Sequence, residues 1–317
     1  MLRKSCFPGS GRSGNRLVAF LSTNASDRRQ HRPVLKGKVS PMRQVPESIA
    51  YPDYALSSIP APSPDHIMVF NDPVVISKIR KSGRLARKML DYANSLVEPG
   101  ITTEDIDYMT MREIIAHGAY PSPINYYGFP KAVCSSVNEV VCHGIPDDRK
   151  LVDGDMISID VSVFLDGYHG DNCGTIICGT SSDPSAENLI SGTQEALDRA
   201  IAICRPGARF SEIGREIERV AARRDLRVVH EFCGHGTGPS LHMQPTVEHC
   251  ANRSPHVMEA GMVFTIEPIL VEGSRRLATW RDGWSAVTMD GGRGAQFEHE
   301  VLITENGVEV LTIPEDN

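Results

Sequence analysis

The stretch DGDMISIDVSVFLDGYHGDNCG, residues 153–174, constrains the fold more than any other part of this sequence. Met156 to Phe164 is typical of a buried strand, yet Asp160 lies in its middle, and a second acid, Asp171, follows a glycine-rich turn. Burying a carboxylate is costly unless it is paired or binds a cation. This hairpin therefore predicts a functional site inside the fold.

An internal repeat places another acid in an equivalent strand. EPGITTEDI (98–106) aligns with RPGARFSEI (205–213) at an offset of 107 residues. The same offset aligns GDMISID (154–160) with GMVFTIE (261–267), so that Asp160 matches Glu267. Because self-similarity at a long period indicates a duplicated unit, we expect two similar α/β halves, each with an acid embedded in a strand.

Local signals divide the chain into elements. Asn71 or Asp72 can cap a helix that has Pro73 at its first position and ends at EPG, 98–100. A second helix is expected to begin near Thr102 or Thr103, with a capping box to Asp105. We expect strands around 132–142 and 155–164, helices near 186–204 and 211–224, and mostly β structure over 227–312.

The N-terminal region differs in composition from the rest. Residues 1–46 hold ten lysines and arginines against one acid, and serine is frequent. This composition predicts a disordered organellar transit peptide over 1–45, although a basic tail on a cytosolic protein is the alternative. Five prolines indicate an extended strap or linker over 46–66, with an SH3-type ligand as a minority option. The folded domain is then expected over 67–317.

Charge and cysteine content exclude several classes of protein. The net charge of −7 and the pI near 5.9 do not favour nucleic-acid binding. No apolar run reaches the 18 or so residues of a spanning helix, so we expect no membrane association. The eight cysteines form no C-x-x-C pair, which favours reduced cysteines and no zinc finger.

A fourth acid completes a candidate metal site. Glu298, in GAQFEHEVLIT, follows Glu267 through a turn, as Asp171 follows Asp160. If the two halves face each other, the four carboxylates converge and need compensating cations. Arginine or lysine could serve, but a pair of divalent ions such as Mn²⁺, Fe²⁺ or Co²⁺ suits an oxygen-rich set better.

Three histidines are candidates for the same site. His235 lies in FCGHGTGPSLH, where the glycines allow close backbone approach, and this context favours a functional role. His242, seven residues later, and His143, in VCHGIPDD, follow less specific patterns. From the residues alone, a functional and a structural role remain equally open for these two.

The motifs together resemble a known family. YYGFPKAVCSSVNEVVCHGIPDD, IDVSVFLDGYHGD, CGHGTG, FTIEP and AQFEHEVLIT occur in the order found in type 1 methionine aminopeptidases, and the resemblance covers roughly residues 65–312. It implies the pita-bread fold, an α/β (α+β) arrangement of two pseudo-symmetric halves around a dinuclear metal site. The cofactor would be two divalent ions per chain, Co²⁺, Mn²⁺, Fe²⁺ or Zn²⁺.

The resemblance also implies residue roles. Asp160 would chelate one ion, Asp171 and Glu298 would bridge both, and His235 and Glu267 would hold the other. His143 and His242 match substrate-contacting histidines, and Glu267 matches a proposed proton shuttle. The residues that would line the methionine side-chain pocket are Tyr126, Phe129, Cys134 and Trp284. Two positions depart from the family pattern: Phe129 stands where tyrosine is common, and Leu241 where phenylalanine is common.

The subtype, location and partners follow from the same resemblance. Only 31 residues separate Glu267 from Glu298, which leaves no room for the insertion of type 2 enzymes. We expect a mitochondrial enzyme, with plastid and cytoplasm as alternatives, that acts on the N-termini of nascent polypeptides near ribosomes as a monomer. An X-Pro aminopeptidase or prolidase, and a non-catalytic binding protein on the same scaffold, are the competing hypotheses.

Overall fold

The computed structural model describes residues 33–314, and its helices agree with those expected from the sequence. Most of the predicted transit peptide, residues 1–32, lies outside the described residues. Within this range the α-helices are α1 (Pro73–Ser95), α2 (Thr103–Ala116), α3 (Pro184–Ala202) and α4 (Phe210–Arg223), and a 3-10 turn, η1, covers Tyr126–Gly128. Asp72 caps α1 by accepting a hydrogen bond from the Val74 amide, and Thr102 and Asp105 form the predicted capping box of α2.

The 107-residue repeat is confirmed by the positions of these helices. Both α2 and α4 have 14 residues, and their first and last residues are 107 positions apart. The same offset relates the last residue of α1 to that of α3. The chain therefore repeats a helix–loop–helix unit. The acid of the first half, Asp160, lies within the strand Met156–Leu165 as expected, whereas Glu267 lies just beyond the strand Val263–Ile266 that was expected to contain it.

In the first half, strand β4 is at the centre of a four-stranded antiparallel sheet. It pairs with β1 and β2 along one edge and over its full length with β5 along the other. The members are β1 (Tyr120–Pro121), β2 (Cys134–Val137), β4 (Met156–Leu165) and β5 (Tyr168–Ile177). Gly170 of β5 allows a close approach to α1, because a Cβ there would lie 2.4 Å from the backbone of Ser82.

The second half contributes a five-stranded sheet in the order β15-β14-β9-β7-β8. Its strands are β7 (Cys233–Gly236), β8 (Met243–Glu248), β9 (Val263–Ile266), β14 (His299–Thr304) and β15 (Gly307–Val310). Two three-stranded sheets complete the fold, β13-β10-β6 and β11-β12-β3. Their strands are β3 (Val140–Cys142), β6 (Arg227–Val228), β10 (Ile269–Val271), β11 (Leu277–Thr279), β12 (Ala286–Thr288) and β13 (Gly294–Gln296).

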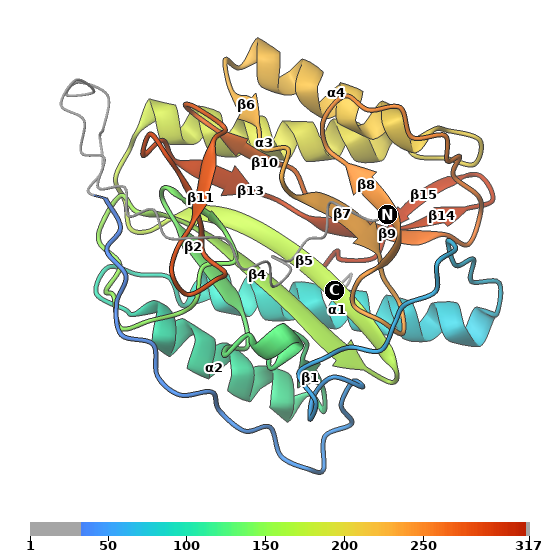
Figure 1. Cartoon of the computed structure of the whole chain (residues 1–317), viewed down its shortest axis with the longest axis horizontal. Coiled ribbons are helices and arrows are strands. Elements are labelled where there is room, and N and C mark those ends of the chain that lie inside the picture. Colours follow the sequence, from blue (N-terminus) through green and yellow to red (C-terminus); the bar gives the residue numbers. More distant parts are fainter. Residues whose placement is uncertain (1–32, 315–317) are drawn as a thin grey trace.

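The strands lie between two pairs of helices, α3 and α4 on one side and α1 and α2 on the other (Figure 1). Each half has its own apolar core: α1 and α2 pack with β4 around Met89 and Ile159, and α3 and α4 pack with β9 around Leu197 and Phe264. The halves join where Cys173 of β5 and Glu298 exchange backbone hydrogen bonds across an isolated bridge. This two-lobed α/β arrangement confirms the fold class expected from the repeat.

The segment before α1 lies against the domain. Figure 1 shows it in blue, along the side that carries α2 and β1. Residues 33–45, which composition predicts to be disordered, make specific contacts: the Gly37 amide donates to Asp147 over 2.6 Å, and Arg43 pairs with Asp107 over 2.7 Å and with Glu104. These contacts are long-range in sequence, so composition alone could not reveal them. The transit-peptide boundary at residue 45 stays a prediction.

Two further expectations concern the described residues. All seven cysteines among them are buried. Across residues 33–314, no helix is both long enough and apolar enough to cross a bilayer.

Candidate metal centre

The hairpin of β4 and β5 forms one wall of a pocket between the halves. Asp160 of β4 and Asp171 of β5 both line it, and so does Ser162, which lies directly opposite Asp171 in the strand register. The Ser162 hydroxyl donates to Asp171 Oδ1 over 2.7 Å. Since side chains alternate along a strand, Asp160 and Ser162 share one face. The embedded acid predicted from sequence therefore points into a cavity.

The opposite wall comes from the second half. His235 lies on β7, Glu267 follows β9, and Glu298 precedes β14. Thr265 links two of them, because its hydroxyl accepts a hydrogen bond from the His235 amide at 3.0 Å and donates to Glu267 Oε1 at 2.9 Å. Gln296 approaches Glu267 Oε2 at 3.4 Å. Hydrogen bonds to both of its oxygens thus orient the Glu267 carboxylate.

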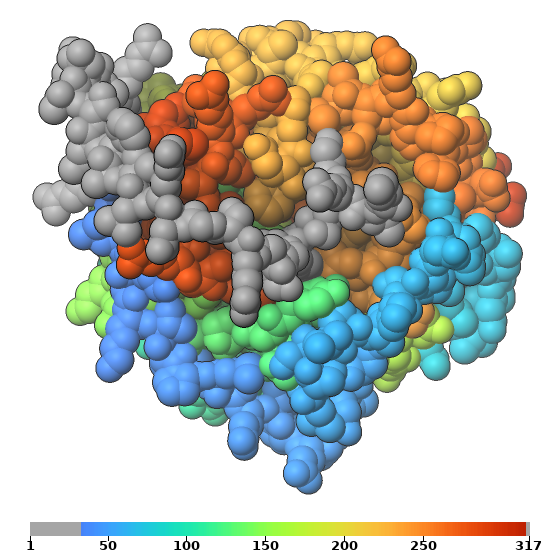
Figure 2. All heavy atoms as spheres, in the orientation of Figure 1, coloured from blue at the N-terminus to red at the C-terminus, as the bar shows by residue number. Residues whose placement is uncertain are grey.

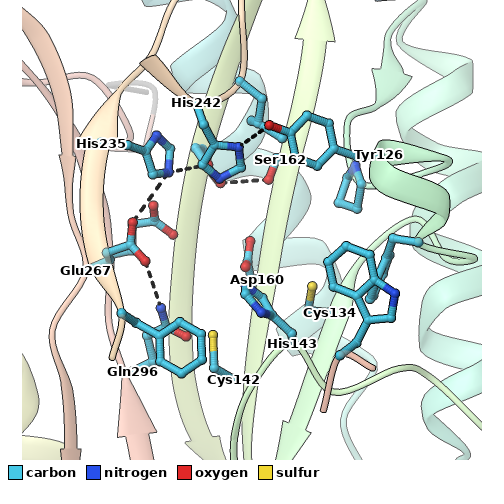
Figure 3. A pocket seen from close by; sticks show the side chains of 17 residues that line it. Tyr126, Cys134, Cys142, His143, Asp160, Ser162, His235, His242, Glu267 and Gln296 are labelled. Atoms are coloured by element: carbon cyan, nitrogen blue, oxygen red, sulfur yellow. Dashed lines mark hydrogen bonds and ion pairs between the residues drawn. The ribbon is translucent and has the colours of Figure 1, made fainter. Parts of the chain in front are cut away.

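The two walls bring five predicted residues together. Ligand atoms of Asp171, His235 and Glu298 all lie within 4.8 Å of one another. His235 Nε2 is 3.4 Å from Glu267 Oε1 and 3.8 Å from Asp171 Oδ2. Figure 3 shows Asp160, His235 and Glu267 pointing into the same space. The pseudo-symmetry therefore delivers acids from both halves to one point.

The burial and mutual repulsion of the carboxylates in this cluster favour the binding of a cation. Burial and mutual repulsion raise the pKa of Asp160 and of Glu298 well above the ordinary range, and burial raises the pKa of Asp171 to about 6. Asp160 Oδ1 is buried without a hydrogen-bond partner. None of the 17 residues that line the pocket is lysine or arginine. A buried, oxygen-rich set with one imidazole fits a divalent metal ion.

The three histidines of the pocket are neutral. Burial lowers the pKa of His143 and of His235 to about 4, and lowers the pKa of His242 well below its ordinary value. A neutral imidazole can either ligate a metal or donate a hydrogen bond. His235 stands among the acids, whereas His143 lies near Trp284, with ring centroids 6.0 Å apart. His242 Nδ1 is 2.8 Å from the Tyr126 hydroxyl.

The apolar part of the pocket contains all four residues expected there. Tyr126, Phe129, Cys134 and Trp284 line the same cavity as the acids. Phe129 meets Trp284 edge to face, with ring centroids 5.1 Å apart, an arrangement that aromatic pairs favour. Leu241, the second departure noted in the sequence, also lines the cavity. The site thus places an aromatic recess beside the cluster of acids.

Sequence reasoning missed several polar supports. Ser162, Thr265 and Gln296 orient the acids, and Phe232 packs on the His143 ring with centroids 5.2 Å apart. The one available signal was spacing, because Ser162 and Thr265 each lie two residues from an embedded acid. Their alternation within strands could have identified them.

A two-lobed α/β fold with a buried cluster of acids and a histidine between its halves suits a metal-dependent hydrolase. Residues 77–305 match metallopeptidase family M24. A methionine aminopeptidase 1B (chloroplastic) of Arabidopsis thaliana is 47% identical over 286 residues, covering 90% of this chain and 76% of that protein. A methionine aminopeptidase 1D (mitochondrial) of Mus musculus is 47% identical over 282 residues, covering 89% and 84%.

The solved structures agree. The crystal structure of methionine aminopeptidase from Rickettsia prowazekii superposes with a TM-score of 0.75 at 36% identity, covering 78% of this chain and all of that one. The chain belongs to metallopeptidase family M24 and, within it, to the type 1 methionine aminopeptidases.

Proposed function

We propose that this protein is a metal-dependent aminopeptidase that removes the initiator methionine from nascent polypeptides whose second residue is small and uncharged. The observation that carries the proposal is the meeting of four acids and His235 beside an aromatic recess. The metal-binding wall can hold the free α-amine and the scissile carbonyl, while the recess receives the methionine side chain. A thioether makes favourable contacts with aromatic rings such as Trp284.

Metal binding is assigned to five residues: Asp160, Asp171, His235, Glu267 and Glu298. Their number and chemistry suit two divalent ions, with Co²⁺, Mn²⁺, Fe²⁺ and Zn²⁺ as candidates. Such ions, when bound, lower the pKa of water and polarise a carbonyl group. Glu267 is hydrogen-bonded by Thr265 and Gln296, and this orientation suits it to accept and return a proton at its carboxylate.

Substrate contacts are assigned to His143 and His242. Both are neutral and line the pocket, so each can donate a hydrogen bond to the peptide. A donor held near an oxygen that becomes negative in the transition state is worth about 3 kcal/mol. Tyr126, Phe129, Cys134 and Trp284 would exclude water from around the methionine side chain.

A peptide assay tests the activity. Purified protein is given Met-Ala-Ser and a matched X-Pro peptide in the presence of Mn²⁺, Co²⁺, Fe²⁺ or Zn²⁺, with Asp171→Ala as the inactive control. We expect release of methionine by the wild type alone, with little turnover of the X-Pro peptide. Preference for the X-Pro peptide would support a prolidase-like enzyme instead. Failure to bind any metal in calorimetry would support a non-catalytic binding protein.

The site of action is proposed to be the mitochondrion. Relatives named as mitochondrial or as chloroplastic/mitochondrial and the basic composition of residues 1–45 both support this proposal. A reporter fused to residues 1–45 is expected to enter mitochondria and to be processed there. Plastid import or retention in the cytosol would select one of the two alternatives. A monomer, by size-exclusion chromatography with light scattering, is also expected.

A further inference from the structure

The chain ahead of α1 contacts two residues of the pocket, although it lies outside the family match at residues 77–305. The Ser63 hydroxyl donates to the His242 carbonyl over 2.8 Å, and Tyr54 packs against Tyr126. Figure 2 shows this segment in blue, beside the green residues of the first half.

Tyr54 is the most deeply buried part of this contact. Its side chain is 1% exposed, and its hydroxyl donates to the Ser122 carbonyl over 2.7 Å. Its ring meets that of Tyr126 edge to face, with centroids 4.8 Å apart at 81°. Leu241 completes a small apolar cluster with these two rings. The Tyr54 ring therefore packs directly against Tyr126 and limits the space into which Tyr126 can turn.

Tyr126 in turn contacts a histidine of the pocket. Its hydroxyl is 2.8 Å from His242 Nδ1, and the two rings lie side by side in Figure 3. An imidazole nitrogen that accepts a hydrogen bond carries no proton. A phenol hydroxyl that donates to Nδ1 therefore leaves the ring proton on Nε2, where it can be donated in turn. The position of the Tyr126 hydroxyl thus decides which imidazole nitrogen is the donor.

We propose that Tyr54 is a positioning residue that acts on His242 through Tyr126, holding the imidazole in the tautomer with its proton on Nε2. The proposal rests on the proposed aminopeptidase function, in which His242 donates to the substrate. The N-terminal segment is then part of the catalytic architecture. Without the Tyr54 ring, Tyr126 can turn into the space left behind, and its hydroxyl moves away from Nδ1.

Kinetics provide the first test. Tyr54→Ala is expected to lower kcat for Met-Ala-Ser about tenfold, whereas Tyr54→Phe, which keeps the ring, stays within about twofold of the wild type. In a Tyr126→Phe background, which has no hydroxyl to position, Tyr54→Ala should cause no further loss of kcat. The control is Tyr51→Ala, in the same segment, because Tyr51 is 50% exposed and lies outside the pocket.

A spectroscopic readout separates this proposal from the proposed function. In protein labelled with ¹⁵N-histidine, the wild type and Tyr54→Phe should give the Nε2–H pattern for His242, assigned by comparison with His242→Gln. Tyr54→Ala should give mixed tautomers. This measurement needs no turnover, so it decides the proposal even if Met-Ala-Ser proves not to be a substrate.

Two results would overturn the proposal. The first is an unchanged His242 tautomer in Tyr54→Ala. The second is that Tyr54→Ala lowers kcat equally in the wild-type and Tyr126→Phe backgrounds, as a merely structural role predicts. If Tyr54→Ala does not fold, Tyr54→Leu replaces it, because leucine keeps apolar volume without an aromatic edge.

Discussion

We expect Asp171→Asn to be more stable than the wild type in the absence of metal, and less stable than the wild type once metal is added. Asp171 is 5% exposed, and its burial raises the pKa from 3.8 to about 6. Between these values the folded protein binds more protons than the unfolded chain, so the free energy of unfolding falls as the pH rises from about 4 to about 6. Above that range the full penalty remains, about 3 kcal/mol for roughly two pKa units.

Asparagine does not carry this penalty, and its side-chain oxygen can still accept the hydrogen bond from Ser162. At pH 7.5 with a chelator, we therefore expect Asp171→Asn to be about 1–3 kcal/mol more stable than the wild type. Metal reverses the order, because a ligand present at a thousandfold excess over its Kd stabilises the wild type by about 4 kcal/mol. The variant has lost a ligand and should gain little.

Urea unfolding in EDTA and in excess Mn²⁺ measures both effects. Asp155→Asn is the matched control, since Asp155 is buried but paired with Arg149 at 2.8 Å and hydrogen-bonded by the Val152 amide. It should be less stable than the wild type in both conditions. If Asp171→Asn is also less stable in EDTA, the argument that uncompensated charge weakens the metal-free site fails.

Three further outcomes are expected. His242→Gln should lower kcat about a hundredfold and leave the metal affinity, measured by calorimetry, unchanged. A weaker metal affinity would instead mean that His242 is a metal ligand. Phe129→Ala removes an aromatic contact with Trp284 and should raise KM for Met-Ala-Ser about tenfold. An unaltered KM would mean that Phe129 does not contribute to binding of the methionine side chain. Lys131 is 1% exposed and pairs with Glu104. Lys131→Met removes this pair, so urea unfolding should show that the free energy of unfolding falls by about 3 kcal/mol. An unchanged free energy of unfolding would mean that the pair is not stabilising.

Much of the scaffold was predictable because the relevant signals are local. The helix starts are set by side chains within three residues of the first turn, Asp72 for α1 and Thr102 with Asp105 for α2. The strand that carries Asp160 shows a strong apolar pattern, and the repeat gave its counterpart at Glu267. Hydrogen bonds between residues a few positions apart can therefore be predicted from the sequence.

The parts that escaped prediction depend on contacts between distant residues. Arg43 is one of many basic residues near the N-terminus, and nothing nearby in sequence reveals that Asp107 lies 2.7 Å away in the fold. Tyr54 likewise lies in a proline-rich segment, yet it is buried against Tyr126. The role of Thr265 also escapes prediction, because the hydrogen bond from the His235 amide to its hydroxyl forms only once β7 and β9 are paired.

The backbone bridge between Cys173 and Glu298 has a mechanical consequence. The Glu298 amide donates to the Cys173 carbonyl over 2.9 Å, so a strand of one lobe is tied to the other lobe two residues from Asp171. Any movement of one lobe away from the other must therefore lengthen these backbone hydrogen bonds, so the tie resists separation of the acids that the two lobes contribute.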